Sequence, residues 1–326
     1  ANMGIMITAS HNPFYDNGLK LFGPDGLKLS DKIEKKIENL IDKKTEILLS
    51  KPETLGRVRR LETGTDTYIN ILKKNFPKKF SLQNMRIVID CANGAGYKAA
   101  PKLMKSLGAE VIVIGDKPNG LNINEKCGSE HMESLQNLVT SEKTLIGIAH
   151  DGDGDRVRFV DRTGAVVDGD QILGLLALSA KREGKLRSST FVSTVHSNQG
   201  LASSLMKNDV SLVTSDVGDR HVYLKMREKG SNWGGESSGH IICTDYLPTG
   251  DGLYAALSLL QTLQMKNSSI DTLAGEIQLW PSLSGSFVVS SKPPIEDIPE
   301  LSEKLSYAVE QLGSDGRILL RYSGTE

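Results

Sequence analysis

The stretch L-I-G-I-A-H-D-G-D-G-D-R-V-R-F-V, residues 145–160, is the most informative part of this chain. It places two short apolar segments, 145–149 and 157–160, on either side of an acidic loop. Short apolar runs bounded in this way predict buried strands. Acidic side chains at the end of a strand are typical of the sites where α/β folds carry out their chemistry. The stretch therefore predicts an α/β fold with a functional site at the loop.

The loop alternates three aspartates with glycines, and an arginine follows directly. In an extended backbone alternate side chains point the same way, so the carboxylates of Asp151, Asp153 and Asp155 would converge. Converging carboxylates repel one another unless a cation lies between them, and Mg²⁺ favours such an all-oxygen site. Arg156 suits a phosphate group better than a calcium buffer. We expect a Mg²⁺ site here, with a solvated acidic turn as the alternative.

Length and composition narrow the class of protein. A chain of 326 residues predicts two or three domains. Its 39 basic and 40 acidic residues leave a net charge of −1, which gives no reason to expect nucleic acid or a membrane as a partner. The 3 cysteines lie far apart, which favours a reducing compartment. Because no apolar run approaches the roughly 20 residues of a membrane span and no secretory signal is visible, we expect a cytoplasmic protein.

Helical and strand-like patterns alternate almost throughout the chain, which is typical of α/β layers. Charged, irregular sequence near residues 51–60 predicts a linker. The predicted strands are 4–7, 86–91, 111–114, 145–149, 157–160, 191–195, 212–215, 286–290 and 318–320. The predicted helices are one that begins near Ser30, then 99–107, 172–180, 222–229, 252–263 and an amphipathic helix marked by Leu301, Leu305, Val309 and Leu312. Both ends of the chain lie in or near motifs, so we expect the chain to be cut at both ends.

Residues 8–13, T-A-S-H-N-P, follow the first predicted strand. A serine exposed at a strand-to-loop corner, such as Ser10, can act as a nucleophile or carry a phosphoryl group. The alternative is a cap and turn, because Ser, Asn and Pro are all turn residues. Adjacent side chains of a strand point to opposite faces, so His11 is expected to be structural. Lys20 is a candidate acid/base or phosphate ligand, or a plain surface lysine.

Three further loops carry candidate ligand-binding groups. Residues 234–240, G-G-E-S-S-G-H, supply the donors and acceptors that sugar hydroxyls need. Residues 216–220, D-V-G-D-R, precede a predicted helix, so they lie at an N-terminus suited to an anion. Residues 321–326, R-Y-S-G-T-E, combine a guanidinium, hydroxyls and a glycine in a candidate phosphate nest. A polar surface turn is the competing interpretation of each loop.

Residues 94–99 match the pattern G-x-G-x-x-A of a dinucleotide-binding fold, and Asp116 lies about 20 residues further on. The match is loose, because Asn93 interrupts the step from strand to glycine and Pro101 lies in the first turn of the helix. A tight turn between strand and helix explains the same glycines. A dinucleotide-binding oxidoreductase remains an alternative at this point.

Taken in order, four of these motifs resemble the α-D-phosphohexomutase superfamily. They are T-A-S-H-N-P, D-G-D-G-D-R, G-G-E-S-S-G-H and R-Y-S-G-T-E. The segments 14–20, 120–131 and 216–220 resemble the branch that acts on hexosamine phosphates more than the phosphomannomutase/phosphoglucomutase branch. The resemblance covers essentially the whole chain.

The resemblance implies a phosphoserine at Ser10 that binds Mg²⁺ together with Asp151, Asp153 and Asp155. The seryl phosphate passes to a hexosamine phosphate, and the resulting bisphosphate reorients and returns its other phosphate to Ser10. Glucosamine 6-phosphate thus becomes glucosamine 1-phosphate, for UDP-N-acetylglucosamine and cell-wall precursors. Lys20 and Arg156 complete the implied catalytic set. The implied substrate contacts are Arg220, Glu236, Ser238, His240, Arg321, Ser323, Gly324 and Thr325.

The same resemblance implies consecutive mixed-sheet α/β domains of the phosphohexomutase type, with a partial first domain and a partial C-terminal α+β domain. The expected domains are residues 1–55, 56–163, 164–280 and 281–326. Two residues depart from the common family pattern, Ser237 and Tyr322. The alternatives are a hexose preference within the superfamily and an inactive truncated fragment that still binds Mg²⁺ and phosphosugar. The sequence leaves a homodimer open.

Overall fold

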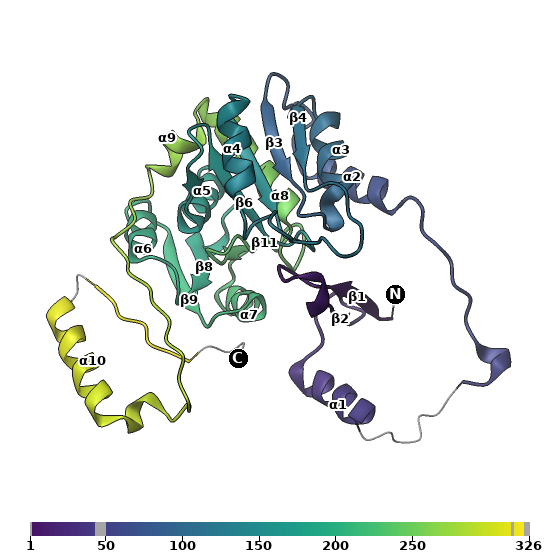
Figure 1. Cartoon of the computed structure of the whole chain (residues 1–326). Helices are drawn as coiled ribbons and strands as arrows, with labels where there is room; N and C mark the ends of the chain where they lie inside the picture. The colour runs from purple at the N-terminus through teal and green to yellow at the C-terminus, as the bar shows by residue number, and fades with distance from the viewer. Residues whose placement is uncertain (1, 43–49, 314–315, 323–326) are drawn as a thin grey trace. The chain divides into compact units, whose positions relative to one another are not determined.

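The structure is a computed structural model that describes residues 2–42, 50–313 and 316–322. The chain divides into two compact units (Figure 1). The first comprises Ala1–Val166 with Cys243–Gln261, and the second comprises Val167–Ile242 with Thr262–Glu326. In the described part of the chain, no helix is both long enough and apolar enough to cross a membrane.

The first unit is built on a 5-stranded mixed sheet. Strand β3 pairs in parallel with β4 and β5, whereas β6 runs antiparallel to β5. In spatial order the strands are β4 (Glu110–Ile114), β3 (Arg86–Asp90), β5 (Ile146–His150), β6 (Val157–Asp161) and β7 (Val166–Val167). The parallel pairing places the carboxyl ends of β3 and β5 at the same edge of the sheet, so the loops that follow them meet there.

Helices cover this sheet. On α4 (Glu133–Ser141), Leu135 and Val139 lie four residues apart and therefore share one face of the helix. They pack against Val88 and Ala149 of the strands, and all four side chains are fully buried. Burying a side chain of this size contributes about 1.5–3 kcal/mol. The first unit also contains α2 (Gly64–Lys74), α3 (Ala99–Ser106) and most of α8 (Gly252–Lys266).

A two-stranded hairpin begins the chain. Strands β1 (Gly4–Thr8) and β2 (Gly18–Phe22) pair antiparallel, with Met6 opposite Lys20. The hairpin therefore brings Lys20 back beside β1, two residues before the end of the strand. Helix α1 (Asp31–Asp42) comes next, and residues 50–62 are irregular apart from one short 3-10 turn, as the predicted linker requires.

The second unit is built on a 4-stranded sheet. Strand β8 pairs in parallel with β9 and β10. The strand order is β11 (Ile241–Cys243), β10 (Trp233–Gly235), β8 (Thr190–Thr194) and β9 (Ser211–Ser215). The helices are α5 (Gly169–Arg182), α6 (Gln199–Met206), α7 (Asp219–Lys229), α9 (Ile270–Ala274) and α10 (Pro299–Leu312). Val222 and Met226 of α7 pack on Val192 of β8.

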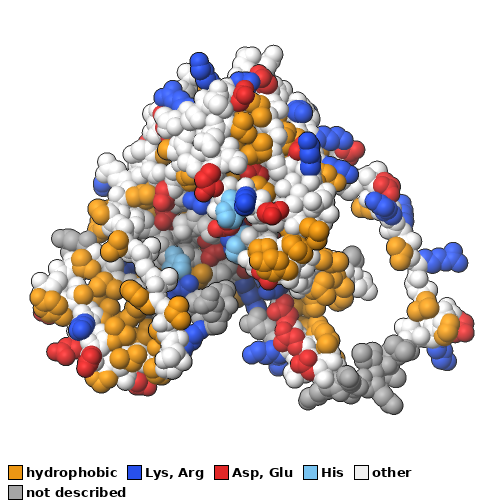
Figure 2. Space-filling view, in the orientation of Figure 1, with side chains coloured by type: hydrophobic (Ala, Val, Ile, Leu, Met, Phe, Trp, Pro, Cys, Tyr) orange, Lys and Arg blue, Asp and Glu red, His pale blue; other side chains and the backbone are white. Residues whose placement is uncertain are grey.

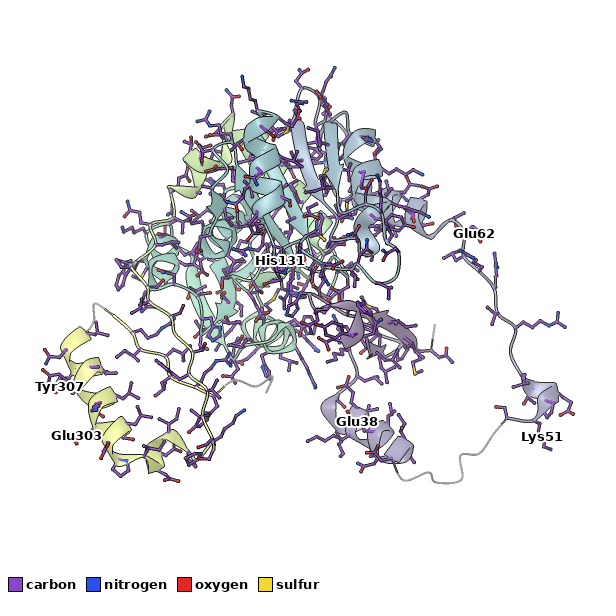
Figure 3. All side chains as sticks on the ribbon, viewed as in Figure 1. Glu38, Lys51, Glu62, His131, Glu303 and Tyr307 are labelled. Carbon is purple, nitrogen blue, oxygen red and sulfur yellow. The ribbon has the colours of Figure 1, made fainter. Side chains whose placement is uncertain are left out.

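Most predicted elements are present with bounds shifted by a few residues. Helices α2, α4, α6 and α9 are missing from the prediction. On α10 the expected amphipathic pattern is present only in part. Leu301 and Leu305 are half-buried while Glu303 and Tyr307 point outward (Figure 3), but Val309 and Leu312 are exposed.

The strands predicted at 286–290 and 318–320 are wrong, because both segments are irregular. A strand is stable only when its backbone N–H and C=O groups pair with a neighbour. No neighbouring strand lies beside either segment among the described residues. Phe287 is 89% exposed, so it buries no apolar surface to compensate. Hydrophobic side chains consequently lie on the surface of this part of the second unit (Figure 2).

Candidate active site

The acidic loop connects β5 to β6 through a series of bends, with Gly154 at a φ of +74°. Asp151, Asp153 and Asp155 each offer a carboxylate oxygen, and these oxygens lie within 4.8 Å of one another. The carboxylates therefore converge as the sequence predicts, but for a different reason. A tight turn with a left-handed glycine brings them together, whereas the prediction assumed an extended backbone.

Two oxygens of this cluster, Asp151 Oδ2 and Asp153 Oδ1, are buried and have no hydrogen-bond partner among the described residues. Burial, together with the neighbouring carboxylates of Asp155 and Asp153, raises the pKa of Asp151 to about 8. Unpartnered buried carboxylate oxygens are costly, and a bound cation would offset both the burial and the repulsion. The cluster therefore fits Mg²⁺, which prefers oxygen ligands from carboxylates.

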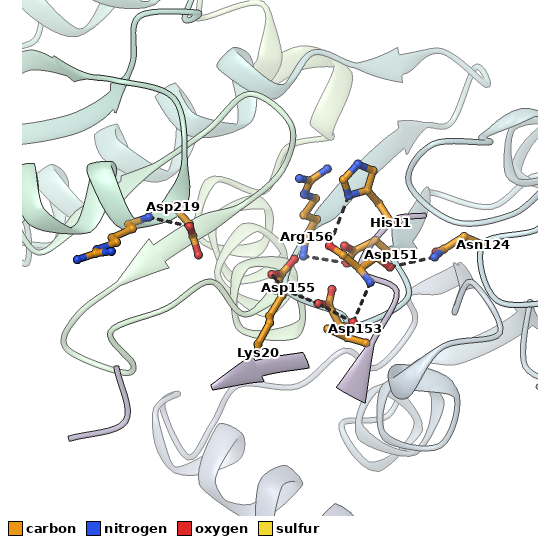
Figure 4. A network of polar contacts seen from close by, with 11 residues as sticks. His11, Lys20, Asn124, Asp151, Asp153, Asp155, Arg156 and Asp219 are labelled. Atoms are coloured by element: carbon orange, nitrogen blue, oxygen red, sulfur yellow. Dashed lines mark hydrogen bonds and ion pairs between the residues drawn. The ribbon is translucent and has the colours of Figure 1, made fainter. Parts of the chain in front are cut away.

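Two basic side chains border the cluster (Figure 4). Lys20 Nζ lies 2.7 Å from Asp153 Oδ2 and 3.6 Å from Asp155 Oδ2. The backbone N–H of Arg156 donates to Asp151 Oδ1 at 3.1 Å, and its guanidinium lies 3.7 Å from Glu130 Oε1. The acids and the two cations together form a site of mixed charge that suits a phosphoryl group and an ion.

Ser10 lies in the same cluster, because its loop is hydrogen-bonded to the acidic loop. The N–H of Ser10 donates to Thr8 Oγ1 at 2.8 Å, and that hydroxyl donates to Asp153 Oδ2 at 3.1 Å. Ser10 has a φ of +52°, in the left-handed region that most residues avoid. Strain of this kind, of about 1–3 kcal/mol, persists only where surrounding contacts hold it.

The expectation that Ser10 and His11 point to opposite faces is wrong. Strand β1 ends at Thr8, and the left-handed turn at Ser10 places its Oγ 3.4 Å from His11 Nδ1. Burial lowers the pKa of His11, and the nearby Arg156 lowers it further. His11 is thus a neutral neighbour of the serine at neutral pH.

Gly94 packs directly against the acidic loop. A Cβ at Gly94 would lie 2.2 Å from the Gly152 carbonyl oxygen, and the N–H of Ala95 donates to that oxygen at 2.8 Å. By contrast, a Cβ at Gly96 would meet nothing within 4 Å. Close approach of two loops accounts for Gly94, so the glycine pattern needs no dinucleotide.

Three residues that sequence reasoning missed, Asn124, Gly252 and His150, make contacts at the site. The side chain of Asn124 donates to the carbonyls of Ser10 and Asn12. Its only signal in the sequence is its place in the segment 120–131. The N–H of Gly252 donates to the carbonyl of Gly154 at 2.9 Å, so the start of α8 supports the acidic loop from behind. His150 Nδ1 lies 3.2 Å from the carbonyl oxygen of Arg156, and burial lowers the pKa of His150 to about 4.

The second unit brings together the loops at 216–220 and 234–240. Glu236 Oε1 accepts a hydrogen bond from the N–H of Gly218 at 2.9 Å. The N–H of Glu236 donates to the carbonyl of His240 at 2.8 Å, which closes the loop. Ser238 Oγ is buried without a partner among the described residues, and His240 is 3% exposed. These polar groups are donors and acceptors of the kind that sugar hydroxyls need.

The structure describes only some of the residues predicted to bind an anion. Arg220 is the second residue of α7, where the helix N-terminus faces the same loop. Arg321 lies within the described residues. Burial lowers the pKa of His196, and the positive charge of Arg321 also contributes to lowering it. Ser323, Gly324 and Thr325 lie outside the described residues.

Three family models match the chain along most of its length. They describe the α/β/α domains I, II and III of phosphoglucomutase/phosphomannomutase, and they match residues 1–48, 66–164 and 168–279. The chain belongs to the phosphoglucomutase/phosphomannomutase family. The predicted fold class, consecutive phosphohexomutase domains, is confirmed, and so is the class of enzyme, an isomerase that transfers a phosphoryl group.

Curated relatives of the chain belong to a narrower group within this family. The chain is 51% identical over 326 residues to the phosphoglucosamine mutase of Pelagibacter ubique and 48% identical to that of Phenylobacterium zucineum. Both matches cover 100% of this chain, and they cover 73% and 72% of the two relatives. The predicted relation to phosphoglucosamine mutase is therefore confirmed.

Solved structures show the same fold. A phosphoglucomutase/phosphomannomutase family protein of Burkholderia thailandensis matches with a TM-score of 0.72 and 25% identity, over 87% of this chain and 60% of that one. The N-acetylphosphoglucosamine mutase of Aspergillus fumigatus, solved with GlcNAc-6P and magnesium, matches with a TM-score of 0.69 and 19% identity. That match covers 99% of this chain and 83% of the fungal chain.

Proposed function

We propose that this protein interconverts glucosamine 6-phosphate and glucosamine 1-phosphate through a phosphoserine at Ser10. The observation that carries the proposal is the hydrogen-bonded path from Ser10 through Thr8 to Asp153, which ties the serine to three converging carboxylates. The relatives named phosphoglucosamine mutase match the whole chain and support the choice of substrate.

The proposed cofactor is Mg²⁺. Asp151, Asp153 and Asp155 would hold it together with a phosphoryl oxygen on Ser10. When bound, the ion neutralises negative charge on the transferring phosphoryl group and lowers the barrier electrostatically. The magnesium in the fungal neighbour supports this choice of ion.

The chain's own residues have distinct parts in the proposed transfer. The P–O bond to Ser10 Oγ breaks as a P–O bond to a sugar hydroxyl oxygen forms, and the hydroxyl proton ends on Ser10 Oγ. We assign the handling of that proton to Lys20, whose Nζ lies in the same cluster as the acids. Arg156 offers its guanidinium to the phosphoryl oxygens. The bisphosphate then reorients and its second phosphate returns to Ser10.

The second unit supplies the proposed sugar contacts. Glu236, Ser238 and His240 lie in one closed loop, with Arg220 at the neighbouring helix N-terminus. Arg321, Ser323, Gly324 and Thr325 are proposed to bind the phosphate that is not transferred. We retain the domain division at 1–55, 56–163, 164–280 and 281–326, which the matched ranges 66–164 and 168–279 support.

The proposal includes a reducing, cytoplasmic location. Cys91, Cys127 and Cys243 are all free thiols and buried, which is usual for proteins of reducing compartments. A homodimer is compatible with the proposal but is not required by it.

The decisive experiment is mass spectrometry of the intact chain and its peptides after incubation with glucosamine 1,6-bisphosphate and Mg²⁺. We expect one phosphate on Ser10 and none in Ser10→Ala. A folded chain that takes up no phosphate would overturn the mechanism. Turnover that is higher with glucose 6-phosphate than with glucosamine 6-phosphate would overturn the substrate and leave the mechanism standing.

A further inference from the structure

The side chain of Asn124 holds the backbone of the serine loop. Its Nδ2 donates to the carbonyl oxygen of Ser10 at 2.9 Å and to that of Asn12 at 2.7 Å. Asn124 lies 114 residues from Ser10 and is 7% exposed. One amide group therefore uses both its hydrogens on carbonyls that flank His11.

Asn124 is itself anchored to the sheet. Its N–H donates to the carbonyl of Ala92 at 2.9 Å, just beyond the end of β3. Its φ of +58° is a left-handed conformation that asparagine tolerates better than most residues. Because the backbone of Asn124 is fixed to β3, its side-chain amide is a rigid reference point for the serine loop.

The same contact includes the acidic loop. A Cβ on Gly152 would lie 2.5 Å from the carbonyl oxygen of Ser10 and 2.8 Å from Asn124 Nδ2. Gly152, which lies between Asp151 and Asp153 in the acidic loop, therefore packs directly against the Ser10 backbone. The side-chain amide of Asn124 packs against both Gly152 and the Ser10 carbonyl.

We propose that Asn124 is a positioning residue for phosphoryl transfer, which sets the distance between Ser10 Oγ and the three carboxylates by holding the Ser10 and Asn12 carbonyls against Gly152. The inference rests on the proposed role of Ser10. The left-handed backbone of Ser10 needs such a restraint, since strained conformations persist only where neighbours over-determine them. Without the amide the loop would relax and carry the serine away from the acids.

Asn124→Asp tests the inference, because it keeps the side-chain shape but removes the donor. On the full chain loaded with phosphate at Ser10, we expect single-turnover transfer to glucosamine 6-phosphate to slow by about 100-fold. The KM for the sugar phosphate should change by less than about twofold, since Asn124 only positions the serine. Hydrogen exchange in the peptide that contains residues 9–13 should become faster.

Asn122→Asp is the matched control. Its side chain binds the carbonyl of Lys117 and the N–H of Asn119 within the same loop, and it has no contact with the serine loop in the described residues. We expect transfer and exchange at residues 9–13 to match those of the wild type. Asn124→Gly, which accepts the left-handed backbone, replaces Asn124→Asp if the added charge prevents folding.

The outcomes separate this inference from the proposed function. Transfer within about twofold of the wild type, with unchanged exchange at residues 9–13 in Asn124→Asp and Asn124→Gly, overturns the role of Asn124 while the phosphoserine mechanism stands. If the wild-type chain transfers no phosphate, the proposed function fails. In that case the positioning role fails with it, and exchange at residues 9–13 still shows whether the amide holds the loop.

Discussion

Asp153 is the residue on which the serine, the lysine and the acidic loop converge. One carboxylate oxygen, Oδ2, accepts hydrogen bonds from Thr8 Oγ1 and from Lys20 Nζ. The other, Oδ1, is buried without a partner among the described residues, and the side chain is only 2% exposed. Removing its charge therefore affects the proposed metal site without exposing new surface.

Asp153→Asn is expected to weaken Mg²⁺ binding by more than about 100-fold, because changing even the outer partners of metal ligands costs 10–100-fold. Binding of glucosamine 6-phosphate should change little, since the proposed sugar contacts lie in the second unit. Titration calorimetry with each ligand measures both effects. The exposed Glu125→Gln is the control, and Mg²⁺ affinity equal to that of the wild type in Asp153→Asn would remove Asp153 from the proposed ligand set.

At the scale of elements, the site depends on two loops that follow adjacent parallel strands. The loop after β3 and the loop after β5 meet where Gly94 faces the Gly152 carbonyl. Parallel pairing of the strands makes their carboxyl ends neighbours, so loops far apart in sequence pack together. Any side chain at Gly94 must displace the acidic loop or the loop after β3.

Gly94→Ala is therefore expected to destabilise the first unit by about 1–3 kcal/mol, the usual cost of overpacking, and to weaken Mg²⁺ binding. The matched control is Gly96→Ala, two residues away, where a Cβ meets nothing within 4 Å. Urea unfolding and Mg²⁺ titration of both variants provide the comparison. Equal stability of the two variants would show that the close approach at Gly94 does not occur in solution.

The start of α5 predicts a pH dependence in the second unit. Asp170 Oδ2 accepts the N–H of Asn198 at 2.7 Å, and burial raises the pKa of Asp170 from 3.8 to about 6. A raised pKa means that the folded state holds the proton more tightly than the unfolded state. The contribution of Asp170 to stability is therefore highest below about pH 4 and falls as the pH rises to about 6.

Asp170→Asn keeps an acceptor for Asn198 but does not titrate. Relative to this variant, the wild type should lose about 3 kcal/mol of unfolding free energy between pH 4 and pH 6, and the difference should then stay constant. Urea unfolding of both proteins across this range measures it. A difference that is independent of pH would show that Asp170 has an ordinary pKa in the folded state.

At the scale of the whole molecule, buried polar contacts join distant parts of the chain within each unit. In the first unit, Tyr68 Oη donates to both oxygens of Asp251, at 2.8 and 2.9 Å, across 183 residues of sequence. Tyr246 Oη donates to Asp251 Oδ2 at 3.1 Å. Asp251 immediately precedes Gly252, which supports the acidic loop, so this carboxylate links α2 to the back of the site.

Tyr68→Phe removes one donor from a buried carboxylate, and such a loss typically costs about 1–3 kcal/mol. We expect the unfolding free energy of the first unit to fall by this amount, while Tyr15→Phe, at a side chain that is 73% exposed, has no effect. Denaturant unfolding measures this change in free energy, taken from the unfolding transition of the first unit. A neutral Tyr68→Phe would mean that the hydroxyl of Tyr246 and the N–H of Tyr254 satisfy Asp251 without Tyr68.

The local sequence was sufficient for most of the fold and for the acidic cluster. Alternating apolar segments predicted the central strands and helices, and residue types at short spacing predicted the converging acids of 151–155. The roles expected for Ser10 and for the polar loop of 234–240 came from the resemblance to a family of enzymes. These features are local, because a strand, a helix or a carboxylate cluster depends on residues next to one another. The strands expected at 286–290 and 318–320 failed for the complementary reason, since a strand also needs a partner that local sequence does not reveal.

The tertiary structure was needed wherever the contact lies between residues far apart in the chain. No pattern in the sequence indicates that Asn124 binds the Ser10 carbonyl, that Gly94 faces Gly152, or that Tyr68 reaches Asp251. The contact of Gly94 with Gly152 follows from the parallel pairing of β3 and β5, which brings their following loops together. The other two contacts join the β1–β2 hairpin or helix α2 to distant loops, and only tertiary packing brings those segments together. Residue types thus define which chemistry is available to this chain, and the packing of its loops defines which groups lie close enough to perform it.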